Sequence, residues 1–561
     1  MQKIFNSSYY FILLFVAYLI LIGVIIYTID FYSKSRIEEI LKILSPLNLK
    51  INFFLILLAI LLCRDNINNA FRRFKNKQGI VFLIVIILGL LIVSFVTPQI
   101  HRIYYDEDIY ANIGQNIALS GKTGFSSYGT FEYDEYFPHW ITYNKEPSAW
   151  PFLISLVFNI FGVNEIYAFY LDNLLFIISV LTVFLIAWSI SSNFYTSILS
   201  SISYIIIPHN LTWSNTLAAE PSAACFTGIA ILCLILFIKN NQNRYLFLLT
   251  TIAPFACQFR PESMMILFIS FFAVGIFSPS RLIKKEVWSF ALITFLFLVP
   301  HILHLYAVSG NSWGAQGDKF SLEFFTKNVW DNGMYYLNNK QFPLILTILA
   351  FIGLILSNNL LKYRMVILLW FLLFWGIFLF FYAGSYFYGA DVRFSLLSFM
   401  PLSILAGMGG YTLIRIFKSF ENTFFYSIVI SLIFSFIVFL PLVRQEGQEA
   451  WGARYDHEYA KKFIEKIPKR SIVLTQNPTM FLLWGQSALQ TYAGPENEGL
   501  IRELLSKYNG HVYFHYNYWC NTKNARNVRL CKDMEEKYNL QEIMTAYEQD
   551  YKYGLYKMSL K

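Results

Sequence analysis

The sequence predicts a polytopic α-helical membrane protein with a small C-terminal α/β domain, and three observations lead to that prediction. The 561 residues are 56% hydrophobic and only 14% charged, with a mean hydropathy of +0.47. Apolar stretches suited to crossing a bilayer recur through the first 443 residues. The last 118 residues, by contrast, hold 31 of the 79 charged residues. This composition excludes a disordered protein and most soluble globular proteins.

Thirteen apolar stretches are expected to span the membrane, although several fall short of the ~20 residues that a bilayer core requires. The first is too long for a signal peptide and has no small-residue cleavage site, so we expect it to be retained. The chain then divides into an N-terminal hairpin with its loop at 1–78, a transmembrane region at 79–443 and a soluble domain at 444–561. The expected spans are 9–29, 47–63, 79–97, 166–189, 194–209, 217–238, 245–258, 263–277, 287–306, 341–358, 365–386, 392–416 and 424–443.

One further apolar run, 150–163, decides the orientation of everything after it. If it does not span, five groups of basic residues all fall on the cytoplasmic side, as the positive-inside rule favours. We therefore expect an interfacial or re-entrant helix there, with the N-terminus inside and the C-terminal domain outside a plasma membrane. The groups are Arg64, Arg72, Arg73, Lys75 and Lys77; Lys239 and Arg244; Arg281, Lys284 and Lys285; Lys362 and Arg364; and Arg415 and Lys418.

Basic residues in the cytoplasmic loops then account for the net charge of +9, so this charge implies no nucleic-acid partner. Acidic residues instead concentrate in the predicted outer loop, 98–148, which has seven carboxylates against three basic residues. Asp106, Glu107 and Asp108 are consecutive there, and helically spaced apolar residues after them predict a short interfacial helix. An isolated acidic run of this kind most often caps a helix. Further charges predicted on the same outer face favour a polar site: Glu220, Arg260, Glu262, Asp391 and Arg393.

Four short motifs follow one another along these outer segments. They are YDEDIYA at 105–111, KEPSAWP at 145–151, FGVNE at 161–165 and Glu220 followed by Pro221. In this order they resemble GT-C membrane glycosyltransferases of the protein O-mannosyltransferase and aminoarabinose transferase type. The resemblance covers residues 79 to about 420. It implies a GT-C-like fold and an outward-facing active site that takes sugar from a polyprenyl-phosphate carrier, in cell-envelope glycosylation.

The resemblance further implies that Asp106 is the catalytic carboxylate, a general base that accepts a proton from the acceptor hydroxyl or amine. Glu107 is the second catalytic candidate. Glu107 or Glu220 could orient the acceptor or, with Asp106, hold a divalent cation, and oxygen ligands suit Mg²⁺ or Mn²⁺. The sequence does not establish that a metal is present. The acceptor is extracytoplasmic, and a protein, a lipid and a glycan all remain open.

The leaving phosphate requires cationic partners, because negative charge at a bilayer edge is poorly solvated. Arg260 and Arg393 are the preferred partners, although salt bridges to Glu262 and Asp391 are an alternative explanation for both arginines. The family has Glu-Lys-Pro where this chain has Lys-Glu-Pro, which places a phosphate contact of Lys145 in question. The full expected substrate-binding set is Tyr110, Lys145, Glu220, Arg260, Glu262, Asp391 and Arg393.

The C-terminal domain is expected to hold strands near 471–475, 511–514 and 553–558 and helices near 498–508 and 532–538. Cys520 and Cys531 are the two cysteines outside the apolar stretches, so they could form a disulfide. We interpret His139, His209, His301 and His304 as interfacial anchors rather than as metal ligands, although His301 and His304 have i, i+3 spacing. His511 and His515 are taken as ordinary, because no third ligand lies at metal spacing.

Two other classes of protein compete with the enzyme hypothesis. A transporter or flippase of lipid-linked saccharides would also need many spans and polar groups, but it should show charges near the bilayer midplane and an internal repeat. The charges here cluster at the expected outer ends of spans, and we find no repeat in the sequence. A structural or sensor protein would explain the C-terminal domain but not the outer-face acids.

Overall fold

The computed structural model describes residues 2–64, 76–311, 315, 317–356, 361–387, 389–416, 421–444 and 451–561. Four of the expected cytoplasmic basic residues, Arg72, Arg73, Lys75 and Lys418, lie outside the described residues. The chain forms two compact units, which we call the helical unit and the sheet unit. The helical unit comprises Met1–Ile100, Lys145–Trp150 and Tyr170–Glu446, and the sheet unit comprises His101–Asn144, Pro151–Phe169 and Gly447–Lys561.

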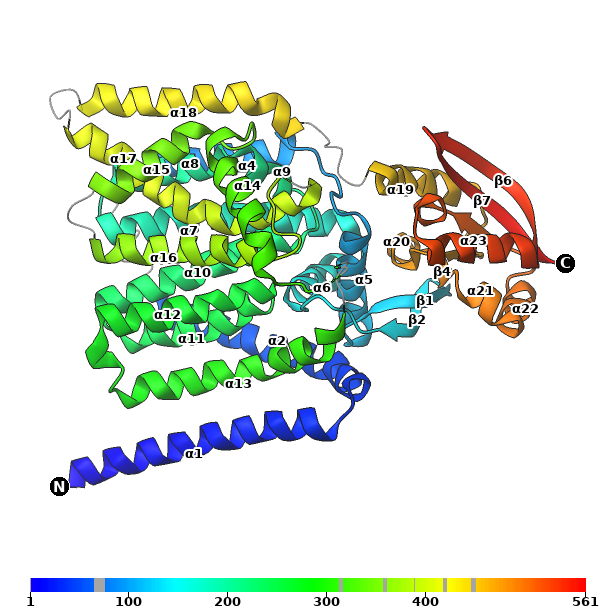
Figure 1. Ribbon diagram of the computed structural model, residues 1–561, viewed down its shortest axis with the longest axis horizontal. Helices are drawn as coiled ribbons and strands as arrows, with labels where there is room; N and C mark the ends of the chain where they lie inside the picture. The colour runs from blue at the N-terminus through cyan, green and yellow to red at the C-terminus, as the bar shows by residue number, and fades with distance from the viewer. Residues whose placement is uncertain are drawn as a thin grey trace. The chain divides into compact units, whose positions relative to one another are not determined.

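Nine helical stretches in the described part of the chain are long and apolar enough to cross a membrane, as expected for a multi-pass membrane protein. Most of them lie side by side in the helical unit (Figure 1). They are built from α1 (Gln2–Phe31), α2 (Lys34–Leu62), α4 (Asn76–Leu91) with the π-helix η1 (Ile92–Val96), α7 (Glu165–Ser191), α10 (Ala219–Asn240), α13 (Lys285–Ala307), α16 (Leu361–Ile377), α17 (Phe399–Ile416) and α18 (Glu421–Arg444).

The other four expected spans are also helical, and all but α11 are shorter than the sequence pattern predicts. They are α8 (Phe194–Ile205), α11 (Asn243–Cys257), α12 (Met265–Phe277) and α15 (Leu344–Leu356), with 12 to 15 residues each. A helix rises 1.5 Å per residue, so none of these four crosses a ~30 Å hydrocarbon core alone. The total of thirteen spans is therefore not confirmed. The short helix α9 (Pro208–Trp213) and helix α14 (Phe325–Asn338) complete this unit.

Small residues let α15 and α17 pack at close range. A Cβ atom on Gly409 would collide with the carbonyl of Leu349, and one on Gly353 would collide with the carbonyl of Leu405. Close backbone approach through glycine is typical of helix pairs in membranes, where there is no hydrophobic effect between helices to drive association. The packing of α17 matters for function because η8 (Gly389–Ser398), which carries two of the expected site residues, leads directly into it.

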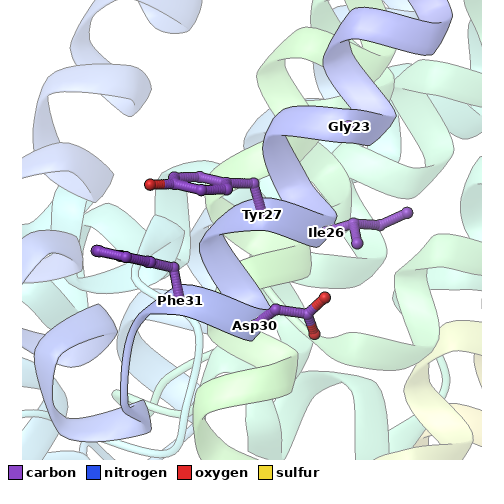
Figure 2. A pocket seen from close by; sticks show the side chains of 5 residues that line it. All are labelled: Gly23, Ile26, Tyr27, Asp30 and Phe31. Atoms are coloured by element: carbon purple, nitrogen blue, oxygen red, sulfur yellow. The ribbon is translucent and has the colours of Figure 1, made fainter.

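Helix α1 packs along α13, where the Tyr18 hydroxyl donates a hydrogen bond of 3.0 Å to the carbonyl of Trp288. Figure 2 shows a pocket on its last turns, lined by Gly23, Ile26, Tyr27, Asp30 and Phe31. The rings of Tyr27 and Phe31 stack there with centroids 5.1 Å apart. Because most apolar side chains of α1 are exposed, this surface suits lipid contact, and we assign no site to it.

The sheet unit contains a seven-stranded mixed sheet in the order β2-β1-β4-β3-β5-β7-β6. Strand β3 pairs in parallel with β4 and β5, and the other pairs are antiparallel. The expected C-terminal sheet domain is thus confirmed. Its strands are β3 (Ile472–Thr475), β4 (Ser487–Gln490), β5 (Val512–Tyr516), β6 (Tyr538–Glu548) and β7 (Tyr551–Leu560).

The first two strands come from the predicted outer loop, where the sequence pattern predicted only a helix. Strand β1 (Phe125–Glu132) and strand β2 (Glu135–Thr142) form a hairpin, and β1 then pairs with β4 through Tyr128 and Leu489. The outer loop and the C-terminal residues therefore share one sheet rather than forming the two separate regions that we expected at 98–148 and 444–561.

Helices pack against this sheet within the same unit. Helix α5 (Tyr105–Ser120) occupies the position of the predicted interfacial helix, but its apolar Ile113 and Ile117 are buried. Helix α6 (Ala149–Phe161) matches the run that decides the topology. The remaining helices are α19 (Trp451–Ile464), α20 (Pro478–Leu483), α21 (Ala493–Glu496), α22 (Glu498–Lys507) and α23 (Ala525–Lys537), and a disulfide between Cys520 and Cys531 joins α23 to η10 (Tyr518–Asn521).

Candidate active site

The three consecutive acids of the outer loop occupy the first turn of α5, but they have different surroundings. Asp106 is partly exposed, and no hydrogen bond or ion pair engages its carboxylate among the described residues. Glu107 and Asp108 are buried, with 0% and 1% of their surfaces exposed. Only Asp106 of the three therefore presents a carboxylate that an incoming molecule can reach.

Glu107 closes the turn that leads into α5. Its Oε1 accepts hydrogen bonds from the backbone amides of Arg102 and Ile103, at 2.8 and 2.9 Å. Its Oε2 lies 3.0 Å from Nδ1 of His101. Burial lowers the pKa of His101, but the hydrogen bonds and negative charges of Glu107 and Glu165 more than offset this and raise it well above its ordinary value. Glu107 thus holds the backbone and an imidazole in place.

Asp108 and its neighbour Tyr105 connect α5 to the C-terminal part of the sheet unit. Asn477 donates a 2.9 Å hydrogen bond to Oδ2 of Asp108, and Nε2 of His457 lies 3.4 Å from Oδ1. The Tyr105 hydroxyl donates to Oδ2 of the buried Asp456 at 2.7 Å. Burial and this carboxylate raise the pKa of Tyr105 well above its ordinary value. These contacts fix the orientation of the helix start that carries Asp106.

A second group of charges lies in the helical unit, around Glu220 on the first turn of α10. Glu220 has no exposed surface, and its Oε1 lies 2.9 Å from Nε of Arg393 and 3.3 Å from Nη1 of Arg260. The two guanidinium groups lie over the ring of Phe394, at 4.6 and 5.5 Å from its centroid. Two cations that share one buried carboxylate oxygen satisfy the condition that buried charge be paired.

Each arginine of this group also has its own carboxylate, as the salt-bridge alternative anticipated. Arg260 Nε lies 3.0 Å from Oε1 of Glu262, and its Nη1 lies 3.4 Å from Oε2 of Glu146. Arg393 Nη1 lies 3.3 Å from Oδ1 of Asp391. The arrangement joins segments that are far apart in the sequence. We call these six residues the charged cluster: Glu146, Glu220, Arg260, Glu262, Asp391 and Arg393.

A cavity of about 320 Å³ adjoins the charged cluster within the helical unit. Arg260, Glu262 and Lys319 supply its charges, and Lys319 donates a 3.2 Å hydrogen bond to the carbonyl of Ser309. Its other walls are mostly apolar, from Leu305, Val308, Phe320, Ile377, Phe378 and Phe381. A cavity lined by two cationic side chains, one carboxylate and mostly apolar walls can receive an amphipathic molecule with an anionic head.

Five of the predicted site residues belong to the charged cluster: Glu220, Arg260, Glu262, Asp391 and Arg393. The other four, Asp106, Glu107, Tyr110 and Lys145, do not. Tyr110 is buried in α5, with 2% of its surface exposed. Lys145 is partly exposed, directly before Glu146 of the cluster. The suggested cation ligands Asp106, Glu107 and Glu220 do not form a metal-type grouping: within the described part of the chain, such a grouping is found for His101, Glu165 and His457.

Sequence reasoning missed Lys319 and these two histidines. Lys319 lies in the long 307–341 connection, where its backbone carbonyl accepts from Tyr382 and Phe320 forms a bridge with Phe381. Its local sequence holds no pattern that singles out this lysine as a site residue. His101 and His457 are separated by more than 350 residues, so no local spacing could have joined them.

A helical unit with many apolar helices and a sheet unit are the architecture that the resemblance to GT-C membrane glycosyltransferases implied. The family described as dolichyl-phosphate-mannose-protein mannosyltransferase matches residues 145–304, a segment that contains Lys145, Glu146, Glu220, Arg260 and Glu262. No curated protein sequence matches the chain significantly.

Solved structures agree in fold at low sequence identity. The structure of ArnT from Cupriavidus metallidurans bound to undecaprenyl phosphate is similar over 86% of this chain and 98% of that chain, with a TM-score of 0.54 and 11% identity. The apo state of the same protein gives a TM-score of 0.53, again over 86% and 98% and at 11% identity. The apo oligosaccharyltransferase of Archaeoglobus fulgidus is similar over 87% and 75%, with a TM-score of 0.50 and 11% identity. At such identities the likeness establishes the fold.

Proposed function

We propose that this chain is a membrane glycosyltransferase that takes a sugar from a polyprenyl-phosphate carrier and transfers it to an extracytoplasmic acceptor. The observation that carries the proposal is the cavity of the helical unit, where Arg260 and Lys319 meet apolar walls. Two findings support it: the fold is that of GT-C enzymes, and the family match at 145–304 covers Arg260 and most of the charged cluster.

The cavity suits the carrier better than it suits a free sugar. A polyprenyl phosphate has an anionic head on a hydrocarbon chain, and the lining combines the cations Arg260 and Lys319 and the carboxylate Glu262 with phenylalanine and aliphatic groups. Arginine and lysine stabilise the negative charge that develops on the phosphate oxygen as the bond to the sugar breaks. Glu220, Glu262 and Asp391 hold the arginines in place, so we propose them as positioning residues.

We propose Asp106 as the general base. The acceptor oxygen or nitrogen attacks the anomeric carbon, its proton passes to the Asp106 carboxylate, and the electron pair of the broken carbon–oxygen bond leaves with the phosphate. Partial exposure and an unengaged carboxylate suit this role. Glu107 and Tyr110 are buried beside it in α5, and we propose that they position Asp106 rather than take part in the chemistry.

The basic loops support a plasma-membrane location with the acceptor side outside the cell. The sugar, and the choice among a protein, a lipid and a glycan as acceptor, are left to the experiment. The same test shows whether sugar transfer depends on Mg²⁺ or Mn²⁺ bound by Asp106. If oxygen ligands hold a catalytic cation, an added chelator would lower the transfer rate.

The test uses the full chain purified in detergent, with a panel of undecaprenyl-phosphate-linked sugars and membrane extracts as the acceptor source. We expect release of undecaprenyl phosphate and appearance of a glycosylated product with at least one donor. A matched arm reconstitutes the protein into liposomes loaded with the same donors. Movement of intact lipid-linked sugar across the bilayer without product would overturn the proposal in favour of a flippase.

A further inference from the structure

We propose that the sheet unit contains a binding site for a divalent transition metal of the zinc type, formed by His101, Glu165 and His457. One potential ligand atom from each residue lies within 4.8 Å of the other two. Two imidazoles and one carboxylate are a common ligand set for zinc with a fourth position open to water or another group. The proposal is independent of the proposed function, because none of the three residues has a role in the sugar-transfer proposal.

Each histidine also has a buried carboxylate beside it. Nδ1 of His101 lies 3.0 Å from Oε2 of Glu107, and Nε2 of His457 lies 3.4 Å from Oδ1 of Asp108. Carboxylates in this position orient metal-binding imidazoles and increase their basicity, and they leave the other ring nitrogen for the metal. Asp108 is itself oriented by a 2.9 Å hydrogen bond from Asn477. The two proposed imidazole ligands are therefore oriented by further residues: Glu107, Asp108 and Asn477.

Glu165 can supply a ligand oxygen without losing its other contact. Lys461 approaches Oε1 at 2.9 Å, whereas Oε2 faces Nε2 of His101 at 3.3 Å. In the absence of metal, a proton shared between His101 and these carboxylates accounts for the same short distances.

The site is enclosed yet accessible. His101 and His457 are 4% and 6% exposed. Glu165 also lines a cavity of about 440 Å³ in the sheet unit, together with Asn164, Gln115 and Trp484, and the Trp484 ring packs edge-on against His457 at 4.7 Å. Because Glu165 lines this cavity, an ion can reach the Glu165 carboxylate through it.

A metal at this point would join three separate segments of the sheet unit. His101 precedes α5, Glu165 begins α7, and His457 lies in α19. Because the unfolded chain does not bring these residues together, metal binding would add directly to the stability of the folded unit. We therefore expect the ion to hold the start of α5 against α19.

The test uses the full chain in detergent at mildly alkaline pH, stripped with a chelator and then titrated with Co²⁺ and with Zn²⁺ alone. We expect one ion per chain, a visible Co²⁺ spectrum of low coordination number, and a higher unfolding temperature with Zn²⁺. His457→Gln and Glu165→Gln should abolish the spectrum. Asp108→Asn should weaken binding by about 10- to 100-fold, as expected for an outer-layer carboxylate. His511→Gln, a histidine of the same unit outside the cluster, is the matched control and should bind like wild type.

Should a ligand variant fail to fold, X-ray absorption of the zinc-loaded wild-type protein replaces it. Scattering from two imidazoles at zinc would support the site. Absence of bound metal in the folded wild-type chain, or Co²⁺ binding that survives both ligand substitutions, would refute the proposal and leave an ion-pair network.

Discussion

Oε1 of Glu220, a carboxylate with no exposed surface, lies 2.9 Å from Nε of Arg393, so that α10 is joined to η8 across 173 positions of sequence. The same oxygen lies 3.3 Å from Arg260. One buried atom thus organises both arginines of the charged cluster. The positions of both guanidinium groups, including that of Arg260 in the cavity wall, therefore depend on the Glu220 carboxylate.

We expect Glu220→Gln to destabilise the helical unit by about 2 to 3 kcal/mol, because the arginines lose a buried, charged hydrogen-bond acceptor. Unfolding in mixed detergent micelles, followed by tryptophan fluorescence, measures the change. Glu323→Gln removes an exposed carboxylate of the same unit and should leave stability unchanged. Equal stability of the two variants would mean that Glu220 does not organise the cluster.

Asp106→Asn should lower the rate of sugar transfer by about 10²- to 10⁴-fold, the usual contribution of a general base. Asparagine keeps the size of the side chain but cannot accept the acceptor's proton. Single-turnover assays with the active donor give the chemical rate separately from donor binding. Asp134→Asn changes an exposed acid of the same predicted outer loop and serves as the control. Undiminished transfer by a folded Asp106→Asn protein would exclude Asp106 as the base.

Lys319→Gln should weaken binding of undecaprenyl phosphate roughly tenfold, because a charge-assisted contact to phosphate contributes about 1.5 kcal/mol or more. The effect should shrink as ionic strength rises. Native mass spectrometry or fluorescence titration measures the affinity. Lys340→Gln removes an exposed lysine outside the cavity and should bind normally. If the two variants bind the carrier equally, the phosphate lies elsewhere.

Gly409→Ala should destabilise the α15 and α17 pair by about 1 to 3 kcal/mol, since the added methyl group forces two closely packed backbones apart. Gly376→Ala is the matched control, because no atom lies within 4 Å of the added Cβ there. Alanine in that helix should be neutral or stabilise by about 0.5 to 1 kcal/mol. Comparable losses in both variants would contradict the close packing.

Reduction of the Cys520 to Cys531 disulfide should destabilise the sheet unit by about 2 to 4 kcal/mol, because the bond closes a short loop in the unfolded chain. Limited proteolysis with and without a reducing agent detects the change. The double substitution Cys520→Ser with Cys531→Ser should start at the lower stability and show no further response to reductant. A continued response would contradict the prediction, because the other four cysteines are free thiols that a reductant leaves unchanged: Cys63, Cys225, Cys233 and Cys257.

Apolar length alone located every long helix of the helical unit, because a bilayer imposes a nearly continuous apolar run of fixed length. The same signal does not settle the number of spans. Helices α8 and α12 are equally apolar, but they have only 12 and 13 residues. The close packing of α15 against α17 depends on glycines of the two helices that meet only in the folded chain. A single sequence does not reveal such contacts.

The candidate site likewise contains residues that the sequence could identify and residues that it could not. Glu220, Arg260 and Arg393 could be identified because each stands out as a charge against an apolar background. Lys319 and His457 could not, since they lie in polar segments where a lysine or a histidine is ordinary. Their significance comes from partners such as Phe381 and His101, which only the folded chain brings close.

The hairpin of β1 and β2 has a consequence for biosynthesis. Its partner strand β4 begins at Ser487, so the strand edge presented by Tyr128 has no neighbour until some 350 further residues have been made. At roughly 5 to 20 residues per second, the edge waits for tens of seconds or about a minute. During that interval an unpaired edge invites wrong partners. We therefore expect ribosomes that stall before residue 487 to leave nascent chains prone to aggregation, and completion of the last strands to be the step that rescues them.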